Sequence, residues 1–173
     1  MSFAVFQIVG FSNSGKTTLV TKWLKRLSEE GYSAVTIKHH GHGEELKVVD
    51  VGKDSEKHRH AGAVGSLVVS NRELQLQLKY EKSPSLENLV KLYDSFEIDV
   101  LVVEGYKREG YEKLLILREK EDLTLLDECT NIQAVVCWNT EEYEILRDSL
   151  CVPVFHITEE TRYISWLMER CMR

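Results

Sequence analysis

The segment from Gly10 to Thr17 restricts the possible folds of this chain more than any other feature. Its sequence, GFSNSGKT, fits the pattern G-x-x-x-x-G-K-[ST] at every fixed position. An apolar, β-rich run over residues 3–9 precedes it, and a helical pattern with one apolar face starts at Lys16. A glycine-rich loop between a strand and a helix predicts a P-loop, the phosphate-binding element of nucleotide-binding α/β proteins.

The residue types in this loop match the chemistry of a triphosphate. Glycines let the backbone wrap closely around phosphates, and the helix N-terminus offers unpaired N–H groups and partial positive charge. Lys16 can reach the β- and γ-phosphates, and the Thr17 hydroxyl can ligate Mg²⁺. The predicted nucleotide-binding residues of the loop are Gly10, Ser12, Asn13, Ser14, Gly15, Lys16, Thr17 and Thr18.

The order of predicted elements indicates a single α/β domain over residues 1–173. Strands are expected at 3–9, 32–37, 63–70, 73–80, 99–104, 113–117, 132–137 and 152–157. Helices are expected from Lys16 to a closing Gly31, and at 54–62, 85–96, 141–150 and 159–172, with Asp54 or Ser55 capping the second. Residues 38–53 are expected to form a mobile loop.

The fold class that follows is a P-loop NTPase-like three-layer sandwich with a mostly parallel sheet. Strand-loop-helix-strand units imply parallel strands, and the solid apolar run at 99–104 is typical of a strand buried on both faces. Residues 73–80 instead alternate leucine with polar residues, and a turn at Asn71-Arg72 precedes them. This alternation predicts an antiparallel hairpin at a sheet edge with one solvated face.

A P-loop needs a carboxylate near its magnesium, at the C-terminal end of a neighbouring strand. Glu104 ends the strand 99–104, so we predict that it ligates Mg²⁺ through water or orients an attacking water. Gly105 could offer its N–H to the γ-phosphate. Asp99 begins the same strand and is expected at the opposite end of the sheet. Asp54, and more weakly Asp50, are further metal candidates in the region after the second strand, with helix capping as the alternative for Asp54.

Three histidines follow the second predicted strand, in Lys38-His39-His40-Gly41-His42. Adjacent side chains of an extended segment point apart, which argues against one tetrahedral metal site. Lys38 and His39 are better suited to bind a phosphate-bearing or heterocyclic substrate. A flexible polar loop is the alternative.

Asn139 is a candidate for recognising the base. It follows the strand 132–137 and has Glu141 and Glu142 close behind, an arrangement compatible with a guanine pocket that lacks its usual lysine. A helix cap at Asn139 or Thr140 explains the same residues. The sequence itself therefore leaves the choice between GTP and ATP open.

Charge and composition exclude some classes of partner. The net charge is −6, and no basic stripe of the kind that nucleic-acid binders carry stands out. No apolar run approaches the ~20 residues that span a bilayer. The four cysteines form no CxxC pair, which favours reduced thiols and a cytoplasmic location.

Several of these segments, in this order, resemble one known family. The P-loop, Lys38-His39-His40, Gly52-Lys53-Asp54-Ser55, Arg59, Ala61-Gly62-Ala63 and Val103-Glu104-Gly105-Tyr106-Lys107 are similar to those of molybdopterin-guanine dinucleotide biosynthesis protein B (MobB). The resemblance covers most of the first 120 residues. The Gly-Lys-Asp-Ser and Val-Glu-Gly-Tyr-Lys segments discriminate it from other P-loop families.

The resemblance implies a homodimeric GTP-binding protein with weak, Mg²⁺-dependent GTPase activity. Such a protein assists the guanylyltransferase MobA in attaching GMP to molybdenum-bound molybdopterin. From the residue chemistry above, Lys16 and Glu104 would act in hydrolysis, and Thr17, Asp54 and Glu104 would serve the metal. The resemblance adds that Lys38 and His39 would face the nucleotide or the pterin. The predicted hairpin would supply the dimer contact.

Two other functions stay open at this point. A small-molecule P-loop kinase would use arginines of a closing lid, for which Arg108 and Arg118 are candidates. A metal-delivery GTPase would use His39, His40 and His42.

Overall fold

The computed structural model describes residues 2–40, 46 and 50–171, which form two compact units. Unit 1 comprises Met1–His39 and Leu86–Arg173, and unit 2 is His40–Ser85. Most of the predicted mobile loop, namely residues 41–45 and 47–49, lies outside the described residues.

Unit 1 is built on a six-stranded sheet in the order β2-β5-β1-β6-β7-β8. All neighbouring strands run parallel, so their C-terminal ends lie at one edge. The strands are β1 (Ala4–Val9), β2 (Ala34–Lys38), β5 (Val100–Glu104), β6 (Lys113–Leu117), β7 (Ile132–Cys137) and β8 (Val154–His156). The P-loop follows the central β1, and every residue of β5 and β6 is buried, as solid apolar strands predict.

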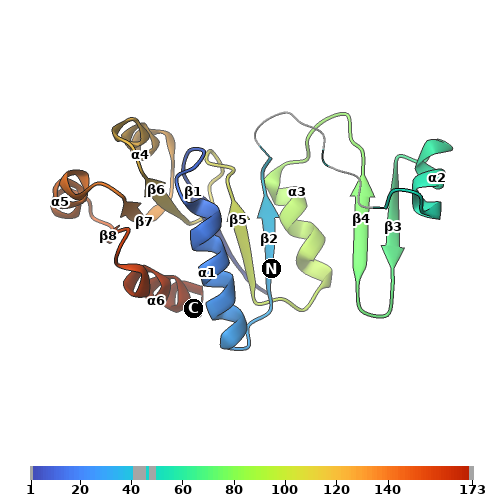
Figure 1. Ribbon diagram of the computed structural model, residues 1–173, viewed down its shortest axis with the longest axis horizontal. Coiled ribbons are helices and arrows are strands. Elements are labelled where there is room, and N and C mark those ends of the chain that lie inside the picture. Colours follow the sequence, from blue (N-terminus) through green and yellow to red (C-terminus); the bar gives the residue numbers. More distant parts are fainter. Residues whose placement is uncertain (1, 41–45, 47–49, 172–173) are drawn as a thin grey trace. The chain divides into compact units, whose positions relative to one another are not determined.

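Helices cover both faces of this sheet, which gives the predicted three layers (Figure 1). One face carries α1 (Lys16–Glu29) and α6 (Glu160–Cys171), and their buried residues, including Trp23 and Leu167, share a core with β1 and β5. The other face packs against α3 (Leu86–Lys91), α4 (Leu125–Glu128) and α5 (Thr140–Ser149). The three-layer α/β fold class is therefore confirmed.

Helix boundaries follow local chemistry where a local signal exists. Gly31 adopts φ 85°, and the Tyr32 N–H donates to Leu27 O at 3.0 Å, so the helix α1 ends at a glycine as predicted. The predicted helix 85–96 is split into α3 and the 3₁₀ helix η1 (Leu92–Ser95).

The helical segment between β6 and β7 was not predicted. It consists of the 3₁₀ helix η2 (Lys120–Thr124) followed by α4. A capping box starts it, in which the Glu119 and Asp122 side chains each bond the other's backbone N–H. Four-residue α4 is too short to produce a helical apolar period in the sequence, which explains the omission.

Unit 2 contains the short helix α2 (Asp54–His60) and the hairpin of β3 (Gly65–Val69) and β4 (Leu74–Leu78). The antiparallel pairing matches the prediction, but the two strands form a sheet of their own rather than the edge of the parallel one. The N-cap of α2 is Lys53, with no side-chain capping bond, so the predicted cap at Asp54 or Ser55 is wrong.

The hairpin has one polar and one aliphatic face, but the face that is exposed to solvent is not the polar one. Ser66, opposite Gln77, accepts a hydrogen bond from Arg59 of α2, so the polar face is the one next to the helix. The opposite face is aliphatic and exposed, with Leu67 and Val69 opposite Leu76 and Leu74. The solvated face is therefore the leucine face, because the Arg59 guanidinium needs polar partners.

No helix in the described part of the chain has the length and apolar character to cross a bilayer.

Candidate functional site

The P-loop backbone is held in a form that only small residues permit. Gly15, the N-cap of α1, has φ 98°, and a Cβ atom there would lie 3.3 Å from Cζ2 of Trp138. A Cβ atom on Gly10 would lie 2.8 Å from the Ile116 carbonyl oxygen. Asn13 also adopts a positive φ of 62°. These positions explain the two fixed glycines of the motif as steric requirements of the turn.

The N-terminus of α1 is suited to an anion. Its N-cap is a glycine without a side chain, and its first turn contains no acidic residue. The unpaired N–H groups of the first turn and the helix dipole therefore give this end partial positive charge. The buried Ser14 hydroxyl has no hydrogen-bond partner among the described residues.

Lys16 folds back over the loop. Its Nζ donates to the Phe11 carbonyl oxygen at 2.6 Å, so the ammonium group lies inside the turn rather than away from it. Burial lowers the pKa of Lys16, and the nearby Glu104 carboxylate partly opposes that shift. A phosphate oxygen could replace Phe11 O as acceptor with only a small movement of the side chain.

Glu104 and Thr17 meet at the start of α1. The Thr17 hydroxyl donates to Glu104 Oε1 at 2.9 Å, and Lys38 Nζ lies 3.1 Å from the same oxygen and 3.3 Å from the Thr17 hydroxyl. The structure therefore brings these three predicted site residues together, from α1, β5 and β2. Asp99 lies at the other end of β5, as expected, where its carboxylate accepts from the Ser33 N–H at 2.7 Å.

The donor set fits a magnesium ion. Mg²⁺ in nucleotide sites takes one or two protein oxygens and completes its shell with phosphates and water. The Thr17 hydroxyl and the Glu104 carboxylate are such oxygens, and the Lys38 ammonium already lies between them as a cation.

The turn after β5 corrects the role expected for Gly105. Its N–H donates to the Ile8 carbonyl oxygen at 3.0 Å, so it is part of the sheet ladder and not directed at a phosphate. The buried Gln7 amide donates to the carbonyl oxygens of Gly105 and Tyr106 at 3.0 and 2.9 Å and fixes this turn. A Cβ atom on Gly105 would lie 3.1 Å from Cβ of His39, so the glycine permits close approach of β2.

Lys38 and His39 both lie at this edge. The His39 and Tyr106 rings are 4.7 Å apart between centroids. His40 belongs to unit 2, and His42 lies outside the described residues. Within residues 2–40, 46 and 50–171, no three His, Cys, Asp or Glu side chains gather where they could hold a metal ion.

Two side chains that the sequence reasoning did not assign to a nucleotide site brace the loop from the β6–β7 side. Arg118 follows β6, and its Nη1 donates to the Asn13 carbonyl oxygen at 2.7 Å. Trp138 follows β7, and its Nε1 donates to the Ser14 carbonyl oxygen at 2.9 Å. The Arg118 guanidinium lies over the Trp138 ring at 5.0 Å. The one available signal was that both residues directly follow a predicted strand.

Asn139 has a structural role. Its Oδ1 accepts hydrogen bonds from the N–H groups of Glu141 and Glu142, at 2.8 and 3.4 Å, as the N-cap of α5. The structure therefore confirms the capping alternative for Asn139, and its recognition of a base stays a prediction. The acidic residues of the first turn of α5 complete this cap because they favour the positive end of the helix.

Asp54 and Asp50 belong to unit 2 and have partners there. Asp54 was predicted to bind the metal. Its exposed carboxylate instead pairs with Lys57 Nζ at 2.8 Å. Asp50 forms a two-pronged ion pair with Arg59 and accepts from the Ser55 hydroxyl. The hydrogen bonds from Arg59 and Ser55 lower the pKa of Asp50 to about 2. Asp50 is thus a structural anion.

Comparison with known proteins identifies related chains. The family model described as MobB, molybdopterin guanine dinucleotide synthesis protein B, matches residues 5–138. A probable molybdopterin-guanine dinucleotide biosynthesis adapter protein of Bacillus subtilis is 39% identical over 154 residues, which is 89% of this chain and 86% of the relative. The crystal structure of Bacillus subtilis MobB aligns with TM-score 0.80 and 35% identity, covering 96% of this chain and 97% of that one. A MobB homologue from Bacillus stearothermophilus aligns with TM-score 0.75 and 33% identity over 97% of both chains.

Proposed function

The chain belongs to the molybdopterin guanine dinucleotide synthesis protein B family, and from this premise we propose that it is a GTP-binding adapter in the biosynthesis of molybdopterin-guanine dinucleotide. In this proposal the P-loop binds GTP with Mg²⁺, and hydrolysis is slow. The chain assists the guanylyltransferase MobA in joining GMP to molybdenum-bound molybdopterin. The relatives that match are themselves named adapter proteins of this pathway.

One observation carries the nucleotide part of the proposal. Lys16, Thr17 and Glu104 converge at a helix N-terminus that has no acidic residue in its first turn. The helix end and Lys16 can balance the charge of the phosphates, while Thr17 and Glu104 can hold the metal. Thr17 and Glu104 would hold Mg²⁺, which would supply positive charge to neutralise the charge that develops on the phosphates.

The same contacts support slow hydrolysis. The Glu104 carboxylate is bound by Thr17 and Lys38, so it is committed to the cation site rather than free to orient an attacking water. Arg118, one of the two kinase-lid candidates, is bound to a loop carbonyl, and this contact does not favour the kinase alternative. Rapid GTP turnover by the isolated chain, measured as phosphate release, would contradict an adapter role.

A second part of the proposal concerns the pterin. Lys38 offers a charged group at the C-terminal end of β2, and the next residue, His39, has its ring against that of Tyr106. A cation next to an aromatic pair suits a ligand that combines a phosphate with a flat heterocycle. These contacts support a pterin-facing edge next to the nucleotide.

A third part of the proposal is a homodimer formed through unit 2. The aliphatic face of the hairpin consists of side chains that are each about half exposed or more: Leu67, Val69, Leu74, Leu76 and Leu78. Contiguous aliphatic surface of this kind is typical of an interface, and a second copy would cover it with the same surface.

Isothermal titration of GTP, with Mg²⁺ and with EDTA, tests the nucleotide site. Lys16→Ala should weaken GTP binding about 30- to 150-fold, because a charge-assisted hydrogen bond contributes ~2–3 kcal/mol. Glu104→Gln should weaken binding about tenfold with Mg²⁺ and much less with EDTA, because only the metal needs the full carboxylate charge.

Lys22→Ala is the matched control. This lysine is also on α1, but it is half exposed and pairs with Glu160 outside the loop. It should leave GTP affinity unchanged. The proposal is overturned if the wild-type chain binds no GTP at millimolar concentration, or if Lys16→Ala and Lys22→Ala behave alike.

A further inference from the structure

Arg118 is held in an unusual way for a partly exposed arginine. Its Nη1 is bound to the Asn13 carbonyl oxygen at 2.7 Å, and its Cζ lies over the Trp138 ring, 5.0 Å from the ring centroid. Trp138 is fixed in turn by its own bond to the Ser14 carbonyl oxygen and by contact with Gly15. The side chain of Arg118 still keeps 44% of its exposure. Its Nε also lies 3.4 Å from Glu119 Oε1, so the exposed part of the guanidinium belongs to a surface ion pair with the neighbouring carboxylate.

The strand order fixes which part of a nucleotide can reach this arginine. Glu104 and Lys38 of the cation site end β5 and β2, which lie on one side of β1 in the sheet, and Thr17 contacts Glu104. Arg118 and Trp138 follow β6 and β7, on the opposite side of β1. In a nucleoside triphosphate the base is at the far end from the γ-phosphate. When the γ-phosphate end lies near the cation site, the base therefore leaves the loop toward β6 and β7.

We propose that Arg118 and Trp138 form the platform on which the nucleobase stacks. In this proposal Trp138 lies against one side of the Arg118 guanidinium, and the base stacks on the other side of the guanidinium. Planar arginine groups stack on aromatic rings and bases, and their charge adds to the attraction. This inference rests on the proposed nucleotide site. It supplies a base contact that does not depend on Asn139, whose Oδ1 caps α5.

Stacking makes a specific prediction about selectivity. Every base presents a π-face, so a stacking platform adds affinity for a base without choosing between guanine and adenine. A residue that merely shapes the loop would instead affect all phosphate ligands equally. The decisive quantity is therefore the ratio of affinities for a nucleotide and for inorganic tripolyphosphate, which has the phosphates but no base.

The experiment titrates GTP, ATP and inorganic tripolyphosphate, all with Mg²⁺, into the wild-type chain and three variants. Arg118→Ala should lower the nucleotide-to-tripolyphosphate affinity ratio about tenfold, equally for GTP and ATP, as the loss of one stacking contact predicts. Arg118→Lys keeps the charge and a donor for Asn13 O but has no flat face, so it should lower the ratio nearly as much.

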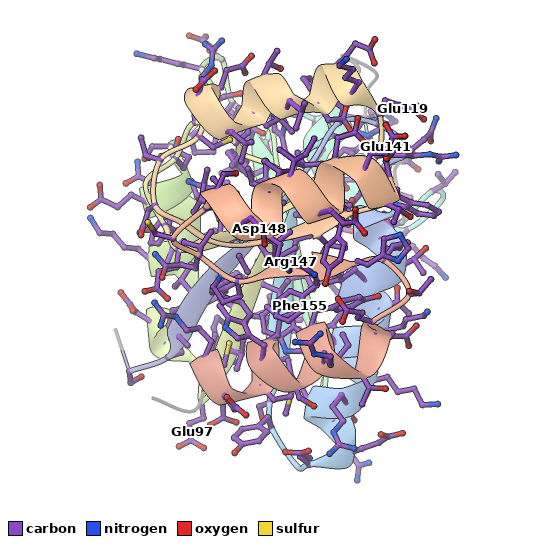
Figure 2. All side chains as sticks on the ribbon, turned by 90° about the vertical axis from the view of Figure 1, so that its left-hand side faces the viewer. Glu97, Glu119, Glu141, Arg147, Asp148 and Phe155 are labelled. Atoms are coloured by element: carbon purple, nitrogen blue, oxygen red, sulfur yellow. The ribbon has the colours of Figure 1, made fainter. Side chains whose placement is uncertain are left out.

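Arg147→Ala is the matched control. Arg147 likewise lies over an aromatic ring, that of Tyr143 at 5.6 Å, and pairs with the next residue, Asp148, as Arg118 does with Glu119. Arg147 lies in the last turn of α5, however, whereas Arg118 is bound to the loop at Asn13 O. Figure 2 shows how far the control lies from the platform. Glu119, the residue after Arg118, lies on the same side of the picture as Glu141 at the start of α5, whereas Arg147 and Asp148 lie further along that helix. Arg147→Ala should leave all three affinities unchanged. Circular dichroism and melting temperature verify that each variant is folded.

The outcomes separate the two proposals. If the wild-type chain binds neither GTP nor tripolyphosphate, the proposed nucleotide site fails and the platform fails with it. If it binds both but Arg118→Ala leaves the ratio unchanged, or weakens both ligands equally, the platform alone is overturned. A loss confined to GTP would also overturn it, since that pattern indicates hydrogen-bonded base recognition rather than stacking.

Discussion

The two compact units of the chain are stabilised in different ways. In unit 1 every residue of β5 and β6 is buried, and the large apolar side chains of α1 and α6 pack on the sheet. In unit 2 the helix α2 has no buried residue and the hairpin keeps its leucines exposed. Its side-chain hydrogen bonds centre on a charged pair, Asp50 and Arg59, with Ser55 and Ser66 as further partners. Unit 1 therefore has its own apolar core, whereas the described part of unit 2 is joined by polar contacts and leaves its aliphatic face exposed.

The difference matters for function because each unit carries a separate part of the proposal. The nucleotide site needs atoms held at fixed distances, and rigid parallel strands provide that precision. The aliphatic hairpin needs only a contiguous surface that another copy can cover.

The largest expected effect contrasts the same substitution in the two units. Leu115→Ala, in the fully buried β6, should lower the free energy of unfolding by about 2–5 kcal/mol, because it removes buried methyl groups and leaves a cavity. Leu76→Ala, at a side chain that is 53% exposed in β4, should lower it by about 0.5 kcal/mol or less. Urea unfolding measures both, at protein concentrations low enough that dilution no longer moves the midpoint. Equal losses would contradict the contrast drawn between the units.

The second prediction separates assembly from nucleotide binding. Leu76→Lys places a charge on the aliphatic face and should weaken self-association at least about tenfold, since burying an unpaired ammonium is costly. GTP affinity should stay unchanged, because the substituted residue is in unit 2 and the P-loop is in unit 1. Light scattering over a dilution series measures the first effect and calorimetry the second. A wild-type chain that is monomeric at all concentrations would remove the dimer proposal.

The smallest expected effect is the pH response of unit 2. Asp50 has a pKa of about 2 in the folded chain against an ordinary 3.8, so its carboxylate binds fewer protons when folded. Its contribution to stability is therefore complete above about pH 4 and is lost as the pH falls toward 2. The protection factors for amide exchange in α2 and β3, which are corrected for the intrinsic pH dependence of exchange, should fall over this range in the wild type. Asp50→Asn has no such carboxylate and should lose this component of the pH response, and an identical response in the variant would assign it to other groups.

Sequence reasoning succeeded where the signal was local. The fixed glycines and Lys16 of the P-loop, the glycine end of α1 and the solid apolar strands follow from residue type and spacing over a few positions. The placing of Glu104 near Thr17, and of Asp99 at the other end of the sheet, also followed, because parallel strands present all their C-terminal ends at one edge.

The sequence by itself thus determined the glycine-rich loop between β1 and α1, the three-layer class and the acidic residue beside that loop. The tertiary structure alone decided that Arg118 and Trp138 brace the loop and that the Gly105 N–H belongs to the sheet. It also decided that Lys113 is buried at the start of an apolar strand, where its Nζ donates to the Glu109 and Thr130 carbonyl oxygens and burial lowers its pKa. Local patterns fix backbone type because propensity and period act within a few residues. Contacts between residues a hundred positions apart depend on which strands become neighbours, and no short window of sequence contains that information.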